Sequence, residues 1–278
     1  MSDPDARTVA ADKTPEPAQA EPEGRRPAVR HAARFQFAMG ALVFCAVAAL
    51  ALAFVFAATS TDETRTTDAW SSFKPSSDGL DSGAREIADY VGREYRLPSG
   101  EQIVAVTGGP LEFPVDQQKL PMKIAVRESV ADGGDIKVFD GRGVLYRMCG
   151  LGVKCSIASG QPSQERALLL RREALELALY SFHYLHDVEH VVVFMPPPKG
   201  KDPSDALHFV RGDVAGQLAR PLRATLPTPV PNPDTIATAP NTPAVQQLTF
   251  ANLFKFSLTV GNQDSSVFLV LDPLPTDS

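Results

Sequence analysis

The feature that most constrains this chain is an uncharged, apolar run of 24 residues from Phe35 to Ala58. The run holds eleven Phe, Leu and Val residues, and Gln36 is its one strongly polar member. A helix of this length extends roughly 36 Å, which is enough to cross a hydrocarbon core of about 30 Å with some tilt. A buried helix of a soluble domain rarely lacks a polar edge over such a length. The run therefore predicts a single transmembrane helix over residues 35–58.

The charges on either side of this run predict its orientation. Residues 25–34 carry four arginines and no acid, whereas residues 59–69 carry three acids and one arginine. The positive-inside rule then places the N-terminus in the cytoplasm and everything after the run outside it. The alternative is a cleaved secretory signal, with Val55 and Ala57 as small residues before the cleavage site, but such signals usually have an apolar region of only about 7–15 residues. We expect a signal-anchored protein of the plasma membrane, with the lipid bilayer as a partner of its 35–58 helix.

The remaining chain divides by composition. Residues 1–34 mix Asp, Glu, Pro and Ala with almost no large apolar residue, which predicts a disordered cytoplasmic tail. Residues 59–81 predict a flexible linker, in which Trp70 is expected either at the lipid interface or in ordinary packing. Residues 82–278 are long enough for one extracytoplasmic domain with a core. They carry 19 Lys and Arg against 22 Asp and Glu, so no basic surplus indicates a nucleic-acid partner.

Periodicity predicts the secondary structure of this domain. An amphipathic helix is expected from Ser82 to Pro98, and a long helix with a wide apolar face from Ser163 to His186. The apolar run Val188–Met195 follows as a strand, which predicts one right-handed strand–helix–strand crossover. Eleven prolines in residues 196–243 favour extended, polyproline-like chain with only short regular pieces.

Two pairs of β-rich runs are separated by short turn sequences and are expected to form hairpins, one from residues 136–140 and 144–148 and the other from residues 253–260 and 266–271. With the crossover, these elements predict an α+β domain. We expect a mixed β-sheet of roughly five to seven strands and one long covering helix.

Two of the three cysteines, Cys149 and Cys155, fall in the part of the chain expected outside the cytoplasm, while Cys45 lies within the expected span. Oxidising compartments favour disulfides, and the glycines between the pair allow the loop to close. A zinc site normally has about two to four residues between paired cysteines, and a redox-active pair has about two. The five residues present here favour a structural disulfide between Cys149 and Cys155.

Three histidines, His183, His186 and His190, would share one face of a continuous helix and so suggest a metal site. The helix is expected to end before Asp187, however, which places His190 on the following strand. We interpret all three as solvated surface histidines and expect neither a metal nor another cofactor.

The acidic residues of the same region are candidates for general acid and base catalysis. They are Glu173, Glu176, Asp187 and Glu189. Carboxylates on a polar helix face more often pair with neighbours such as Arg171 and Arg172, or with water, so we expect no catalytic residue among them.

A further tripeptide, Arg211-Gly212-Asp213, matches an adhesion motif but is too short to carry weight, and Asp213 is equally suited to cap the next helix. Phosphate-loop, dinucleotide, nucleophile-elbow, zinc-protease and EF-hand patterns are not found in the sequence.

The chain contains 18 arginines and nine lysines, with abundant alanine and proline, a usage that resembles high-GC bacteria. The stretch from Val104 to Pro197 resembles uncharacterised single-pass envelope proteins of such organisms, which implies an envelope location and no particular activity. From the anchor and the lack of a catalytic motif we expect a non-catalytic binding or scaffold module with an envelope protein as partner. The alternative is an extracytoplasmic, hydrolase-like enzyme whose site is scattered along the sequence.

Overall fold

The computed structural model describes residues 69–115, 118–128, 134–140, 142–158, 161–261 and 266–274. The expected cytoplasmic tail, the expected span 35–58 and residues 59–68 of the expected linker lie outside these ranges. Within them, no helix combines the length and apolarity needed to cross a bilayer.

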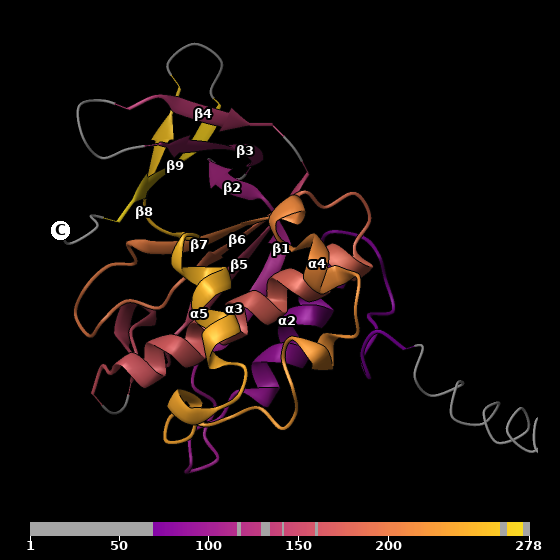
Figure 1. Cartoon of the computed structure of the whole chain (residues 1–278). Helices are drawn as coiled ribbons and strands as arrows, with labels where there is room; N and C mark the ends of the chain where they lie inside the picture. Colours follow the sequence, from indigo (N-terminus) through magenta and orange to yellow (C-terminus); the bar gives the residue numbers. More distant parts are fainter. Residues whose placement is uncertain are drawn as a thin grey trace, which may run out of the picture. The chain divides into compact units, whose positions relative to one another are not determined.

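These residues form a mixed α+β domain (Figure 1). Its α-helices are α2 (Ser82–Glu94), α3 (Gln164–Tyr184), α4 (Ala215–Leu218) and α5 (Thr242–Phe250). Its 3-10 turns are η1 (Val153–Cys155), η2 (Arg211–Val214), η3 (Leu222–Ala224) and η4 (Ile236–Thr238). Its strands are β1 (Ala105–Pro110), β2 (Glu112–Val115), β3 (Gln118–Arg127), β4 (Ile136–Phe139), β5 (Gly143–Cys149), β6 (His190–Phe194), β7 (Asp205–Val210), β8 (Leu253–Val260) and β9 (Val267–Pro273).

The strands form one nine-stranded sheet in the order β1-β5-β6-β7-β8-β9-β3-β2, with β4 paired to β3. The β5–β6 and β3–β9 pairs are parallel and the others are antiparallel. The two ends of this order meet through Leu111, which lies between β1 and β2. Its amide donates to the carbonyl of Gly143 (2.9 Å), and its carbonyl accepts from the amide of Met122 (3.0 Å). The sheet is therefore nearly closed.

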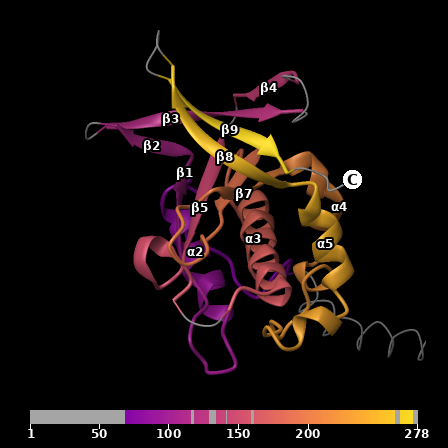
Figure 2. The ribbon, with the colours of Figure 1, turned by 90° about the vertical axis from the view of Figure 1, so that its left-hand side faces the viewer.

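Two hydrophobic cores lie on opposite faces of the sheet. Along β6, Val191 and Val193 belong to a core shared with the helices, which we name the helix-side core. Val192 and Phe194 belong to a second core enclosed by the curved sheet, which we name the inner core. This alternation follows from the two-residue period of a strand. Helices α2, α3 and α5 lie on one side of β5, β6 and β7, while β3, β4, β8 and β9 lie on the other (Figures 1 and 2).

Helix α3 confirms the predicted long helix. It begins after Ser163, whose hydroxyl accepts the amide of Arg166 (3.2 Å) as an N-cap. The solvated polar face expected on it is wrong, because Arg172 and Glu176 are buried. Helix α2, the turn η4 and helix α5 pack around α3 in addition to the sheet, so it has almost no face left for water.

The predicted crossover is present, since α3 connects the parallel strands β5 and β6. The predicted C-terminal hairpin is present as β8 and β9. The hairpin expected from residues 136–140 and 144–148 is wrong, because the two strands exist but do not pair with each other. Strand β4 pairs with β3, whereas β5 lies between β1 and β6. The glycine-containing connection thus joins two different regions of the sheet, and the full sheet has more strands than expected.

One further expectation, that of a flexible linker up to Asp81, needs correction. The described end of the expected linker, 69–81, packs on the domain, with Trp70, Phe73 and Leu80 against the helix-side core. The amide of Leu222 also donates to the carbonyl of Trp70 (2.8 Å). The proline-rich segment 196–243 contains only short regular pieces, as expected, namely β7, α4 and three 3-10 turns, and it runs directly into α5, where Pro243 occupies the first turn.

Candidate functional site

The two cysteines named as a site lie at the end of β5. The Sγ atoms of Cys149 and Cys155 are at disulfide distance, 2.06 Å apart. The loop between them closes tightly, because the amide of Gly150 donates to the carbonyl of Cys155 (2.7 Å). A Cβ atom at Gly150 would meet the carbonyl oxygen of Ser156 at 2.2 Å, so this position requires glycine. The tight loop thus brings the two cysteines to disulfide distance.

The three histidines considered as metal ligands lie in three different environments. His183 is exposed on α3 and its ring stacks on Trp70, with ring centres 4.0 Å apart. His186 is exposed and its Nε2 lies 3.1 Å from a carboxylate oxygen of Asp187. His190 is buried, so its interpretation as a surface histidine is wrong. Among the described residues, no three His, Cys, Asp or Glu side chains are grouped to hold a metal ion.

His190 has a buried partner that the sequence analysis did not single out. Its Nδ1 lies 3.2 Å from Nε2 of His208 on the neighbouring strand β7, and the ring of Phe139 from β4 lies 5.0 Å from the His190 ring. Burial, and to a smaller extent the adjacent His190, lower the pKa of His208 to about 3. Burial also lowers the pKa of His190. The two neutral rings can share one N–H···N hydrogen bond at the edge of the inner core.

The acids of α3 are buried rather than solvated, which corrects the expectation for Glu173 and Glu176. The hydroxyl of Tyr95 donates a hydrogen bond to the carboxylate of Glu176 (2.6 Å). The guanidinium of Arg172 donates to the Tyr95 hydroxyl and to the Glu176 carboxylate, the latter at 3.2 Å. Glu173 is fully buried and neither carboxylate oxygen has a hydrogen-bond partner. Burial raises the pKa of Glu173 well above its usual value, the Glu176 charge raises it further, and Arg172 opposes them. Glu173 is therefore best accommodated as a neutral acid.

Burial also raises the pKa of Glu176, and Arg172 and the Tyr95 hydrogen bond oppose that rise. A further hydrogen bond fixes the cluster, because the guanidinium of Arg172 donates to the carbonyl of Pro227 (2.9 Å). These contacts join α3 to α2 and to the chain after η3. The cluster is thus a packing element of the helix layer, and it was missed because its partners are distant in sequence.

Arg211, the first residue of the adhesion-like tripeptide, acts within the fold. Its guanidinium donates to the carbonyl of Val188 (2.8 Å) and also contacts that of Phe182. Asp213 does not cap α4, whose N-cap residue is Val214 and has no side-chain cap hydrogen bond. The tripeptide therefore anchors the turn after β7 to the end of α3.

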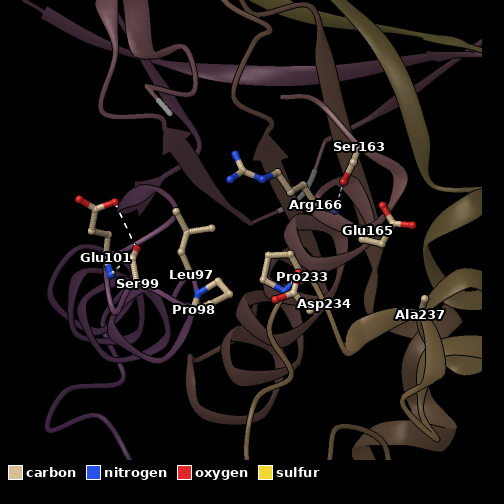
Figure 3. A pocket seen from close by; sticks show the side chains of 10 residues that line it. All are labelled: Leu97, Pro98, Ser99, Glu101, Ser163, Glu165, Arg166, Pro233, Asp234 and Ala237. Atoms are coloured by element: carbon tan, nitrogen blue, oxygen red, sulfur yellow. Dashed lines mark hydrogen bonds between the residues drawn. The ribbon is translucent and has the colours of Figure 1, made fainter. Parts of the chain in front are cut away.

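The described surface carries a groove of about 660 Å³ between the chain around Leu97, the start of α3 and residues 233–237 (Figure 3). Its charged side chains are Glu101, Glu165, Arg166 and Asp234. None of these four is buried, and Figure 3 shows that their charged groups do not converge on one point. A second groove of about 510 Å³ lies at the end of α3 and includes His183, His186 and Asp187. Neither groove brings a buried titratable group into its lining, which binding sites for small polar ligands commonly do.

The remaining candidate is the face of β4, β3, β9 and β8 that points away from the inner core, which we name the outer face. Alternation along the strands assigns its apolar members, which are Ala125, Ile136, Val138, Phe268 and Val270. Ile136 and Val138 are 53% and 51% exposed. Lys123 lies above the Phe268 ring, and Arg127 pairs with Asp272 (2.6 Å) on the same face. The helices cover the other half of the sheet, not this one (Figure 2).

Comparison with known proteins adds no assignment to this site, because the chain matches no family model, no curated protein and no solved structure.

Proposed function

We propose that this protein is a single-pass, membrane-anchored, extracytoplasmic module that binds another protein of the cell envelope and performs no catalysis. The apolar run 35–58 and its flanking charges support the anchor and its orientation. The cysteine pair at disulfide distance supports an oxidising compartment for the domain.

The observation that carries the binding role is the outer face. Helices cover the face of the sheet that carries the helix-side core. On the outer face, which no helix of the described residues covers, the β-branched side chains of Ile136 and Val138 in β4 remain half exposed. Exposed apolar side chains beside an unpaired strand edge favour association with another chain. The outer face thus has the composition of a protein-binding surface with apolar centre and charged margins.

The test is site-specific photocrosslinking in intact cells, with a photoreactive amino acid at Val138 of the full chain. The matched control carries it at Val153, which is 83% exposed on the loop that follows β5. We expect a protein adduct from Val138 and not from Val153. Adducts from neither position, or from both equally, would reject the binding role. A periplasm-dependent reporter fused after Ser278 tests the orientation, and activity confined to the cytoplasm would reject the anchor.

A further inference from the structure

Strand β4 has one paired edge and one free edge among the described residues. The amide of Glu128 donates to the carbonyl of Asp135 (3.0 Å), so this pair is a hydrogen-bonded pair of the β3–β4 ladder. Bonded and non-bonded pairs alternate along an antiparallel ladder. Lys137 and Phe139 therefore bond to β3, while Ile136 and Val138 turn their N–H and C=O groups to the free edge.

We infer that a second copy of this chain occupies this edge, with β4 pairing antiparallel to β4 of its partner about a twofold axis through Ile136. The inference rests on the proposed binding role of the outer face and assigns its free strand edge to a second copy of this chain. A twofold axis is the commonest symmetry of soluble oligomers, and it requires a surface that is complementary to itself. The sequence of β4 and the two residues before it determines whether that requirement is met.

Three antiparallel registers bring the outward-facing backbone groups of two β4 strands together. With the axis at Lys137, the two Lys137 side chains lie directly opposite each other. With the axis at Val138, each Ile136 on the outer face lies opposite Asp140 of the other copy. Both registers are unfavourable, the first by like-charge repulsion and the second because an apolar side chain meets a carboxylate.

The register about Ile136 has neither defect. It sets each Lys137 opposite Asp135 of the other copy, at a non-hydrogen-bonded pair where side chains approach most closely. Both side chains are exposed, and neither forms an ion pair within the described ranges. On the outer face, Ile136 meets Ile136 of the other copy, and Val138 meets Gly134, which has no side chain to obstruct it.

A pairing between two four-residue strands buries little surface, so dimer formation depends on the local concentration and the orientation of the two copies. Anchored copies share one plane and one orientation, which raises the concentration of one β4 strand around another without any added contact. We therefore expect a dimer that forms readily in a membrane and dissociates on dilution in detergent.

The experiment is a charge exchange between the two positions, measured on the full chain in lipid vesicles by energy transfer between labelled copies. Lys137→Asp sets acids opposite acids, and Asp135→Lys sets lysines opposite lysines, so each variant alone is expected to associate about tenfold or more weakly than the parent chain. An equimolar mixture of the two variants restores both opposite-charge pairs, and so does the double variant. Both are expected to associate within about twofold of the parent chain. Val153→Asp is the matched control and leaves association unchanged.

Backbone pairing is tested separately with Val138→Pro. This substitution removes an N–H that faces the free edge and leaves the β3–β4 ladder intact, so dimerisation is lost while the fold persists. Failure of the mixture to restore association overturns the register, and parent chains that stay monomeric in vesicles overturn the dimer. If Val138 crosslinks to a different protein while the chain is monomeric, the binding role stands and the second copy is rejected.

Discussion

The two halves of the sheet differ in how many faces they bury. Strands β5, β6 and β7 are covered by helices on one face and by the inner core on the other, and β6 is accordingly an uninterrupted run of buried residues. Strands β3, β4, β8 and β9 cover the inner core with one face and present the other outward. The first half therefore contributes most of the buried core, while the second leaves one face of its strands without a covering helix among the described residues.

The largest expected difference between the two halves is in the free energy of unfolding when an aspartate is introduced into each. Val193 is fully buried in the helix-side core, so Val193→Asp is expected to lower the free energy of unfolding by about 4 kcal/mol or more. Val138→Asp on the outer face is expected to change it by no more than about 0.5 kcal/mol. Urea unfolding of the full chain in detergent, followed by fluorescence of the single tryptophan Trp70, measures both. Equal losses would show that the two halves are equally buried.

The pH dependence of stability tests the boundary between the two halves, where the buried His208 packs beside Phe139. The unfolded chain binds a proton at this histidine near its ordinary pKa of 6.5, and the folded chain does so only near pH 3, so stability falls as the pH drops between these values. Between pH 7 and pH 4, the free energy of unfolding of His208→Gln should therefore fall by about 3 kcal/mol less than that of the parent chain. Unfolding curves at both pH values measure the difference, and an identical acid sensitivity in the variant would place His208 in contact with water.

The same contrast explains which parts of the fold the sequence predicts. The crossover through α3, the β8–β9 hairpin and the cysteine loop depend on residues near one another in the chain, so periodicity and spacing suffice to find them. The pairing of β4 with β3, and the closure through Leu111, depend on which strands meet across the sheet. Two strands separated by a glycine turn give the same local pattern whether or not they pair with each other.

The candidate sites follow the same division. A helical wheel of α3 groups Arg172 and Glu176 correctly, but it contains nothing to show that Tyr95, 81 residues before Glu176, covers them. His190 was separated correctly from the helix, yet its partner His208 belongs to a strand whose pairing is non-local. An exposed strand such as β4 carries no distinguishing pattern either, because its alternation is the same as that of a covered strand.

Glu173 tests whether the helix-covered half tolerates a charge. Its folded-state pKa is raised above the ordinary 4.5, so the unfolded chain ionises first and stability falls as the pH rises above that value. Glu173→Gln keeps the shape and removes the ionisation, and is expected to raise the free energy of unfolding at pH 7 by on the order of 2 kcal/mol. The gain should disappear near pH 4. A variant less stable than the parent chain at pH 7 would show that Glu173 is ionised and paired in the fold.

An effect of similar size is expected at the disulfide, which closes a loop at the end of β5. Cross-linking two cysteines six residues apart restricts the unfolded chain by only about 2 kcal/mol on the chain-entropy account. Cys149→Ser with Cys155→Ser should therefore lower the free energy of unfolding by about 2 kcal/mol and leave β4 association unchanged, because the loop lies at β5. Reduction of the parent chain should have the same effect and should release two thiols beyond Cys45 for alkylation. If those thiols react before reduction, the pair is open in the cell, and the domain then folds without the disulfide in a reducing compartment.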